Sequence, residues 1–370
     1  MELLNATGLQ AGYTMGMRPD GRELLVVAVK GTFNIPPIRQ PVTRAEQQKP
    51  LIDADSFTGE PGFSAPLYEV DYAPVKPMCD VLLNGSAYAP GGKPTSRVEV
   101  TLRIGSMYKS FAVTGNRSWE AGKLAISPGY PELFERMPIS YDNAFGGVDN
   151  FHENEQKHAA WMSNPVGCGY HKQLAGELVD GTPMPNTEEL KRPVSMPNGT
   201  YAPMAFGPIG RGWDPRRQLA GTYDQEWIDN TFPFLPPDFE EAYYQAAPTD
   251  QQIPYLQGGE RVFLENLTPE GQTSFDLPQI DMPAVFFYKN GEQRDLRAVI
   301  DTLVIEPDEG IFTLTWRASI PLRKNLFEMS QVLLGRKPRG WWRARKLGKT
   351  YYPTLAHAKV EKQIQALGED

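Results

Sequence analysis

Short segments in which apolar and polar residues alternate recur along this chain, and they indicate a β fold. In Arg97–Ile104, valine, leucine and isoleucine occupy every second position, with arginine, glutamate and threonine between them. Successive side chains of a strand point to opposite faces of a sheet, so this segment predicts a strand with one buried face. Clusters of glycine, proline, asparagine and serine at 90–96 and 114–118 bound this segment and the next strand candidate, 108–114. Such clusters form turns, and strands joined by turns are typical of antiparallel sheets.

Comparable strand signals lie in two separate parts of the chain. The first part has them at 23–35, 79–87, 97–104 and 108–114, and the second at 260–267, 273–277, 284–288, 296–305 and 311–318. We therefore predict a mainly β protein with two β-sandwich-like lobes, an N-terminal lobe at 1–125 and a C-terminal lobe at 259–320. The 34 prolines and 34 glycines in 370 residues favour short strands and turns over long helices.

Residues 126–258 connect the two predicted lobes and show few clean periodicities. The stretch 128–260 contains 16 prolines, 14 glycines and many aromatic residues. Bulky aromatic side chains need partners to bury against, so we expect this segment to be ordered but irregular and to lie over the lobes. Residues 321–370 are expected to form a basic helical tail, with helices at 322–334 and 353–366.

The sequence shows no catalytic motif with the required spacing. GGKPTS at 91–96 lacks the pattern of a phosphate-binding loop, and neither G-x-S-x-G nor H-E-x-x-H occurs. The four histidines and two cysteines give no zinc spacing. Cys168 and His171 are conceivable as a nucleophile pair, but three residues apart in a Gly-rich turn their side chains need not meet. We expect no enzyme activity, no cofactor, no metal site, and reduced, buried thiols.

The N-terminus and the charge of the chain bear on location and on the class of partner. MELLNATGLQ has neither a basic leader nor a long apolar core, which predicts a cytoplasmic protein. The apolar runs are too short to span a bilayer. A net charge of −8 gives the body no attraction for nucleic acid. Neither nucleic acid nor a membrane is therefore an expected partner.

The C-terminal region is strongly basic, unlike the rest of the chain. Residues 323–349 hold nine lysines or arginines and one acid. Within this region Trp341, Trp342, Arg343 and Arg345 form a cluster of the residue types that most often anchor protein interfaces. Two other interpretations stay open. The tryptophans could fold back onto the body, or the cluster could contact nucleic acid or lipid.

The stretch LAGTYDQEW at 219–227 is either a catalytic loop or a folded corner. Gly221 suits a turn, and the threonine and first aspartate after it suit hydrogen bonds to nearby backbone. Tyr223 and Trp227 are expected to be buried aromatic anchors. The three acids at 224–229 could instead contact a partner or supply paired catalytic carboxylates. We favour the interpretation in which these residues have a structural role.

Several motifs in the middle of the chain resemble one bacterial family. They are MPISYDNAFGG at 137–147, SNPVGCGY at 163–170, PMAFGPIGRGWDPR at 203–216 and the long stretch beginning LAGTYDQEW. VVAVKGTFNI near the N-terminus and DTLVIEPDEGIFTLTWRA at 301–318 extend the similarity over most of the chain. The chain resembles proteins encoded in type VI secretion gene clusters, beside spike proteins and toxins. G-T-Y-D-x-x-W together with N-P-x-G-x-G-Y makes the resemblance specific.

The resemblance implies a non-catalytic adaptor or chaperone that helps an effector toxin to reach the spike of the secretion apparatus. Its partners would be an effector toxin, a spike protein of the VgrG or PAAR type, or both. The motif residues, with structural or partner-contacting roles, are Tyr141, Phe145, Gly146, Gly147, Asn164, Pro165, Gly167, Gly169, Gly221, Thr222, Tyr223, Asp224, Trp227, Pro236, Asp238, Gly259 and Glu260. A carbohydrate-active or other hydrolytic enzyme of β architecture is the alternative, and a structural spike component is a third hypothesis.

Overall fold

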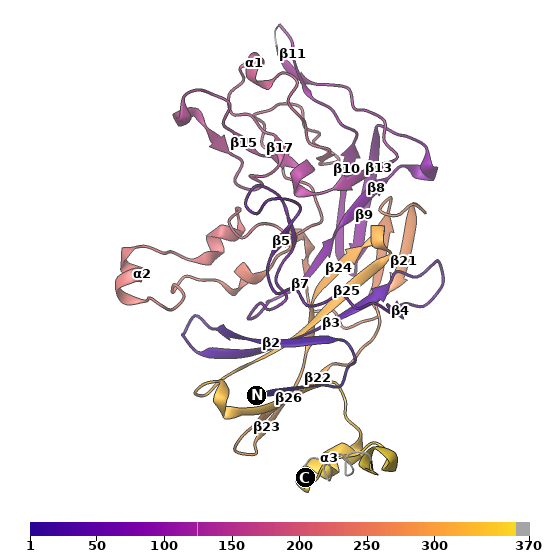
Figure 1. Cartoon of the computed structure of the whole chain (residues 1–370). Coiled ribbons are helices and arrows are strands. Elements are labelled where there is room, and N and C mark those ends of the chain that lie inside the picture. The colour runs from indigo at the N-terminus through magenta and orange to yellow at the C-terminus, as the bar shows by residue number, and fades with distance from the viewer. Residues whose placement is uncertain (124, 360–370) are drawn as a thin grey trace, which may run out of the picture.

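Strands from both ends of the chain combine in the large sheets of this protein (Figure 1). The structure, a computed structural model, describes residues 1–123 and 125–359. Strands dominate and helices are few and short, which confirms the prediction of a mainly β fold.

The largest sheet has seven strands and a long antiparallel pair at its centre. Its strands are β19 (Gln252–Ile253), β7 (Cys79–Leu83), β24 (Val299–Glu306), β25 (Ile311–Pro321), β3 (Glu23–Asn34) and β2 (Gln10–Met17), in that spatial order, with β4 (Thr43–Arg44) beside β3. The centre of β3 is buried on both faces because it reads LLVVAV, a run of apolar residues rather than an alternation.

The second sheet has five strands, and it contains the alternating segment that the sequence identified. Its order is β18 (Thr187–Glu188), β10 (Met107–Thr114), β9 (Arg97–Ile104), β20 (Arg261–Glu265) and β21 (Gln272–Asp276). In β9 the alternate residues Val98, Val100, Leu102 and Ile104 are buried, as predicted.

The third sheet has four strands and corrects the prediction for the C-terminal region. Its order is β1 (Glu2–Asn5), β26 (Met329–Leu334), β22 (Pro283–Tyr288) and β23 (Gln293–Arg297). The helix predicted at 322–334 is therefore wrong: only Leu326–Glu328 form a 3-10 turn, and the second half is β26, which pairs with β1 and β22. Helix α3 (Arg339–Lys346) follows, and 355–359 are helical. The rest of the helix predicted at 353–366 falls on 360–370, outside the described residues.

The predicted irregular segment contains only short elements. Its small strands outside the large sheets are β12 (Ile126–Pro128), β13 (Arg136–Ile139), β14 (Phe145–Gly146), β15 (Val148–Asp149), β16 (Ala159–Ala160) and β17 (Cys168–Gly169). The small strands that precede the segment are β5 (Ser56–Phe57), β6 (Pro66–Tyr68), β8 (Gly85–Tyr88) and β11 (Trp119–Ala121). Helices α1 (Gly176–Val179) and α2 (Gln225–Asn230) and several 3-10 turns complete it. Phe145 packs with Trp119 and Tyr201 in a small core of its own, so these aromatic side chains are buried, as expected.

The two predicted lobes share their sheets. Strand β24 pairs with β7, β25 with β3, and β20 with β9, so ranges 1–125 and 259–320 are joined in both larger sheets. One core contains residues of both ranges, among them Leu25, Phe111 and Phe312. The sequence pattern predicts these ranges in different lobes, whereas the structure joins them. Local alternation identifies each strand and its hairpin neighbour, whereas pairing between distant strands is decided by burial that no short segment reveals.

Candidate functional site

One segment projects from the body and carries exposed aromatic side chains. Figure 1 shows α2 at the end of this segment, away from the large sheets. We call residues 221–240 the arm. Its two ends meet at the body, where the backbone N–H of Glu240 donates to the carbonyl of Leu219 at 3.0 Å. The arm is therefore a closed loop with a defined neck.

Gly221, Thr222 and Asp238 build the neck of the arm. The φ angle of Gly221 is 81°, in the region that favours glycine. A Cβ atom at this position would lie 2.9 Å from both Asp238 Oδ1 and Pro236 Cβ. Asp238 accepts from the Thr222 backbone N–H at 3.0 Å and from Thr222 Oγ1 at 2.7 Å, and these bonds lower the pKa of its carboxyl group. The neck thus depends on a glycine and on an acceptor 16 residues from Thr222.

The arm is also braced by its own side chains. Asp224 Oδ1 accepts from the Trp227 backbone N–H at 2.9 Å and so caps the N-terminus of α2. The Trp227 indole N–H donates to the carbonyl of Phe234 at 2.9 Å, which ties the helix to the returning chain. The rings of Tyr223 and Phe232 lie 4.8 Å and 5.6 Å from the indole, centroid to centroid. These contacts connect α2 to the chain on either side of it within the arm.

The outer surface of the arm is aromatic and acidic. Its exposed large side chains are Tyr223 (52% exposed), Ile228 (53%), Phe232 (65%) and Phe234 (46%). The prediction that Tyr223 is a buried anchor is therefore wrong, and Trp227 is only half-buried. The reason is that the body covers just one side of the arm, which no local pattern reveals. Residues 221–240 also contain five acids and neither lysine nor arginine.

A buried arginine joins the two limbs that flank the arm. The guanidinium of Arg216 donates from Nε to the carbonyl of Tyr243 at 2.8 Å and from Nη1 to the carbonyl of Ile209 at 2.9 Å. Its remaining nitrogen pairs with Glu69, on the segment after β6. Ile209 precedes the arm and Tyr243 follows it, so one side chain holds both limbs to the body.

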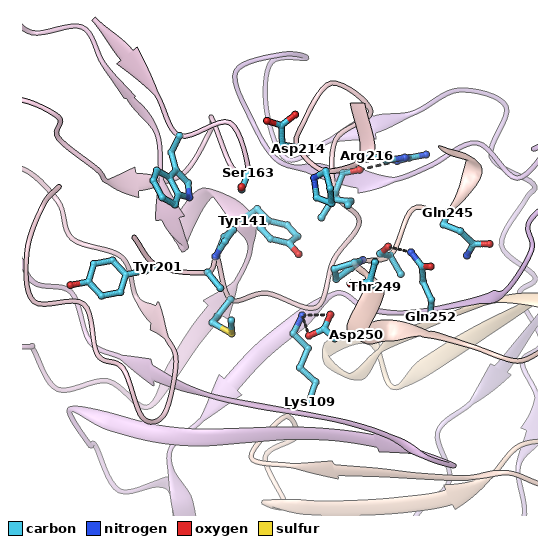
Figure 2. A pocket seen from close by; sticks show the side chains of 18 of the residues that line it. Lys109, Tyr141, Ser163, Tyr201, Asp214, Arg216, Gln245, Thr249, Asp250 and Gln252 are labelled. Carbon is cyan, nitrogen blue, oxygen red and sulfur yellow. Dashed lines mark hydrogen bonds and ion pairs between the residues drawn. The ribbon is translucent and has the colours of Figure 1, made fainter. Parts of the chain in front are cut away.

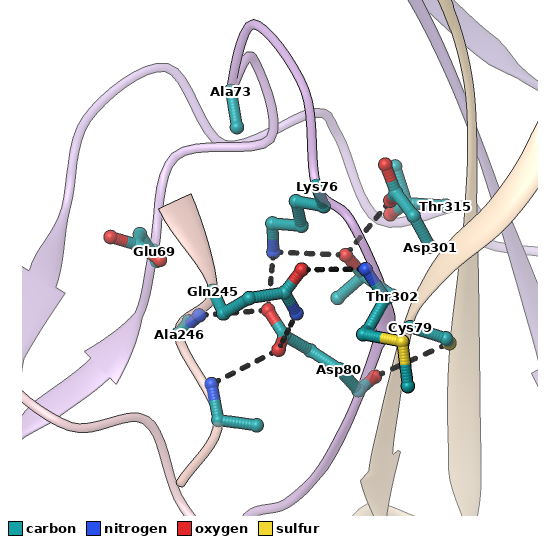
Figure 3. Close-up of polar contacts among 12 residues, drawn as sticks. Glu69, Ala73, Lys76, Cys79, Asp80, Gln245, Ala246, Asp301, Thr302 and Thr315 are labelled. Carbon is teal, nitrogen blue, oxygen red and sulfur yellow. Dashed lines mark hydrogen bonds and ion pairs between the residues drawn. The ribbon is translucent and has the colours of Figure 1, made fainter. Parts of the chain in front are cut away.

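A second anchor lies under the limb that follows the arm (Figure 3). The carboxylate of Asp80, in β7, is fully buried and accepts from Lys76 Nζ at 2.7 Å and from Gln245 Nε2 at 2.6 Å. It also accepts from the backbone N–H groups of Ala246 at 2.8 Å and Ala247 at 3.2 Å. No motif in the sequence predicts this site. The available signal was a single acid inside the apolar strand CDVLL, which a buried strand tolerates only when the acid has partners.

A cavity of about 490 Å³ lies at the foot of the arm, where Leu219 and Ala242 contribute to its lining. At its floor, Lys109 Nζ donates to Asp250 Oδ1 at 3.2 Å and to the Gln251 side chain at 2.7 Å. Burial lowers the pKa of Lys109. Tyr141, which follows β13, also lines the cavity, and its ring is labelled in Figure 2. Apolar walls with a few convergent polar groups are typical of ligand sites.

The motif residues near 141–169 form a tight corner behind this cavity. Asn164 is fully buried, and its Nδ2 donates to the carbonyls of Tyr141 at 2.8 Å and Phe145 at 3.2 Å. A Cβ atom at Gly146 would lie 2.1 Å from the Asn164 carbonyl oxygen, and one at Gly167 would lie 2.4 Å from another carbonyl. Glycine is required here because two backbone segments touch.

The remaining motif residues lie in the same corner or in a turn near 257–260. Gly147 and Gly169 have φ angles of 108° and 88° in the same corner, which also contains the turn residue Pro165. Far from it in sequence, Gly259 has a φ angle of 90°, and Glu260 accepts from the backbone N–H groups of 257 and 258 at 2.7 Å and 2.9 Å. The motifs thus divide between the corner, the arm and this last turn, and they do not converge on one catalytic centre.

Cys168 and His171 have separate surroundings. Burial raises the pKa of the Cys168 thiol to about 12, so a thiolate is disfavoured there. The Nε2 atom of His171 lies 3.0 Å from the hydroxyl of Thr182, and burial lowers the pKa of the imidazole. The other cysteine, Cys79, is buried in β7, and burial raises the pKa of its thiol as well.

The tryptophans of the basic tail pack onto the body. Trp341 and Trp342 lie 6.5 Å and 6.0 Å from the ring of Phe287 in β22, centroid to centroid. The Arg345 guanidinium lies 3.7 Å from the centre of the same ring, whereas Arg343 is exposed. Of the alternatives left open for this cluster, the structure shows the one in which the tryptophans fold back.

These observations define a mainly β protein with a braced, projecting arm and a cavity at its foot. The chain belongs to a family described as an uncharacterized protein conserved in bacteria (DUF2169), whose sequence profile matches residues 20–317. No curated protein and no solved structure gives a match. Within residues 1–123 and 125–359, no helix is both long and apolar enough to cross a membrane, and no cluster of three or more candidate metal ligands occurs.

Proposed function

We propose that this protein is a non-catalytic adaptor that binds a partner protein with the arm. The observation that carries the proposal is the exposure of Tyr223, Ile228, Phe232 and Phe234 on one braced segment. Grouped apolar side chains at the surface mark interaction sites more often than isolated ones. Aromatic residues, tryptophan and tyrosine above all, contribute most to the binding energy of protein interfaces.

The bracing supports a binding role because it reduces the entropy lost on association. A flexible loop must be ordered when it binds, at about 0.5–1.5 kcal/mol for each immobilised side chain. In the arm, the Thr222–Asp238 bonds, the Trp227–Phe234 bond and the Arg216 anchor hold the shape in advance. The exposed rings are thus presented by a rigid support, as the anchors of a tight interface usually are.

The charge of the arm indicates what kind of partner surface would bind it. Five acids and no basic residue in 221–240 surround the aromatic side chains. A complementary surface would hold an apolar groove with lysine or arginine at its rim. Charge complementarity of this kind mainly raises the association rate, so the affinity should fall as salt is added.

The resemblance of the sequence motifs supports a more specific proposal. The partner is an effector toxin, a spike protein, or both, and the adaptor assists the loading of the toxin onto the spike of a type VI secretion system. The encounter takes place in the bacterial cytoplasm. An adaptor of this kind holds its cargo and later releases it. An interface of moderate size with a few aromatic anchors suits that task.

A hydrolytic enzyme is the second candidate, and the cavity is the observation that favours it. Glu189, Asp214 and Asp250 all line it, and paired carboxylates perform acid–base chemistry in glycoside hydrolysis. Asp250, however, forms an ion pair with Lys109, so this carboxylate already has a partner within the protein. Hydrolysis that disappears in Asp214→Asn or Asp250→Asn, with partner binding retained, would favour the enzyme.

Binding by matched variants tests the adaptor proposal. An effector toxin and a spike protein of a type VI secretion system from the same bacterium are purified and titrated with the native protein and with Phe232→Ser. Phe327→Ser is the control, because Phe327 is 79% exposed and lies outside the arm. We expect the affinity to fall about tenfold or more for Phe232→Ser, with only a small decrease in melting temperature because its ring is 65% exposed, and no loss of affinity for the control. Equal affinities for the three proteins would contradict the proposal.

A further inference from the structure

Strand β2 forms one edge of the seven-stranded sheet, and this edge lacks the usual protection. β3 lies on one side of it, and within residues 1–123 and 125–359 no strand lies on the other. Its eight residues, QAGYTMGM, include no charge and no proline, and the pairing with β3 contains no bulge. Natural edge strands are usually protected by charge, proline, a bulge or short length. β2 has none of these.

The β2–β3 hairpin fixes which backbone groups of β2 point outward. The Arg18 N–H donates to the carbonyl of Arg22 at 2.9 Å, so these two residues form a hydrogen-bonded pair. In an antiparallel ladder such pairs alternate, and the even-numbered residues of β2 therefore direct their backbone groups at β3. The residues whose N–H and C=O groups point away from the sheet are Ala11, Tyr13, Met15 and Met17.

These outward groups are free to pair with another strand. In the described part of the chain their only hydrogen bond is a long one, 3.5 Å from the Thr14 hydroxyl to the Met15 carbonyl. The side chains of Tyr13 and Met15 are 40% and 38% exposed. An open row of donors and acceptors is a template for strand addition.

We propose that the occupant of this edge is β2 of a second copy of the chain, paired antiparallel about a twofold axis at Thr14. In that register Tyr13 lies opposite Met15 of the second copy, and Ala11 opposite Met17. It is the one antiparallel register in which all four outward residues of each strand find a partner. The two seven-stranded sheets then form one continuous sheet. The inference does not depend on the adaptor proposal.

Charge and side-chain fit favour a second copy over a foreign strand. Copies of a protein with a net charge of −8 repel each other, but β2 brings no charge into the pairing. Arg18, just beyond its end, would stand opposite Gln10, so no like charges face each other in this register. The thioether of Met15 would meet the ring of Tyr13 on the exposed face, which is a favourable contact. The interface is self-complementary, as a twofold dimer requires.

A charge placed on the axis tests the register. We expect the full-length native protein to sediment as a concentration-dependent dimer. Thr14→Glu and Thr14→Lys should each raise the dissociation constant about tenfold or more, because like charges would face each other across the axis. An equal mixture of the two variants should restore the dimer. A native protein that stays monomeric up to its solubility limit would overturn the proposal, and so would a mixture no tighter than either variant alone.

Removal of an outward amide tests the edge itself. Met15→Pro deletes one N–H that points away from β3, a position where an edge strand tolerates proline. Met15→Ala is the matched control that keeps the amide. We expect the proline variant to lose dimer while its melting temperature stays close to that of the alanine variant. Dimers of equal strength in the two variants would show that another surface holds the copies together.

Discussion

Replacement of Asp80 by asparagine should strongly destabilise the protein. The change keeps the size of the side chain and removes its charge, leaving the buried Lys76 ammonium without the carboxylate 2.7 Å away. It also turns an amide NH2 towards donors that now point at Asp80, from Gln245 and Ala246. Breaking a buried pair by removing one partner costs about 3–5 kcal/mol. We therefore expect a loss of unfolding free energy in that range, measured by urea denaturation at neutral pH.

The pH dependence of this loss identifies its cause. Burial lowers the pKa of Lys76, whereas the negative charges of Asp80, Asp301 and Glu69 raise it. The second effect is larger, so the pKa of Lys76 in the folded protein lies above its value in the unfolded chain. The stabilisation by Lys76 is thus present below the unfolded pKa of about 10.4 and is lost as pH rises through the folded pKa. Without Asp80, we expect burial to prevail and the folded pKa to fall below the unfolded one. The deficit of the variant should then shrink as pH rises from neutral towards about 10.

The control for this experiment is the double variant Lys76→Met, Asp80→Asn. It removes both charges and should be more stable than Asp80→Asn alone, since no uncompensated ammonium is left in the interior. A loss below about 1 kcal/mol for Asp80→Asn, the range of an exposed ion pair, would refute the reasoning. A deficit that does not change with pH would do so too, because it would assign the loss to the amide contacts instead of Lys76.

Three further outcomes follow from the arm and the tail. Trp227→Ala should cost less than the roughly 3–5 kcal/mol of a fully buried aromatic, because the indole is half-buried, and chemical denaturation measures this. Asp224→Asn should leave the melting temperature nearly unchanged, because asparagine caps a helix about as well as aspartate, and should slow partner association slightly in stopped-flow experiments. Deletion of 336–370 should lower the melting temperature, because it uncovers Phe287. An unchanged melting temperature for the deletion would mean that the tryptophans contribute nothing to packing.

The strands could be predicted from the sequence because their signal is local. Arg97–Ile104 shows its buried face in eight consecutive residues, and the structure has the same bounds for β9. The partner of β9 on its other side, β20, lies more than 150 residues away in the chain. Nothing in either strand specifies the other, so the sharing of sheets between the chain ends was not predictable from alternation.

Errors arose where one pattern fits two structures. Leu322, Leu326 and Met329 have helical spacing, yet Met329–Leu334 is a strand, because β1 and β22 offer it two edges to pair with. The sequence around Trp341 and Trp342 is equally compatible with interface anchors and with residues packed on the body. Tertiary contacts decide such cases.

The candidate site was visible in part. The glycine at 221 and the polar residues after it marked a folded corner, and the neck of the arm is built from them. The exposure of Tyr223 was not visible, because exposure depends on what the rest of the chain covers. The roles of Asp80 and Arg216 could not be predicted from the sequence, because their partners come from segments far away in the sequence.

Site-specific photo-crosslinking in the native bacterium tests the central claim most directly, because it asks whether the arm touches another protein. A photoreactive amino acid is placed at Phe232 in the arm and, in a matched strain, at the exposed Phe327 outside it. The account predicts a crosslinked product of defined mass at Phe232, containing a toxin or spike protein, and none at Phe327. A product at Phe327 with none at Phe232 would contradict it.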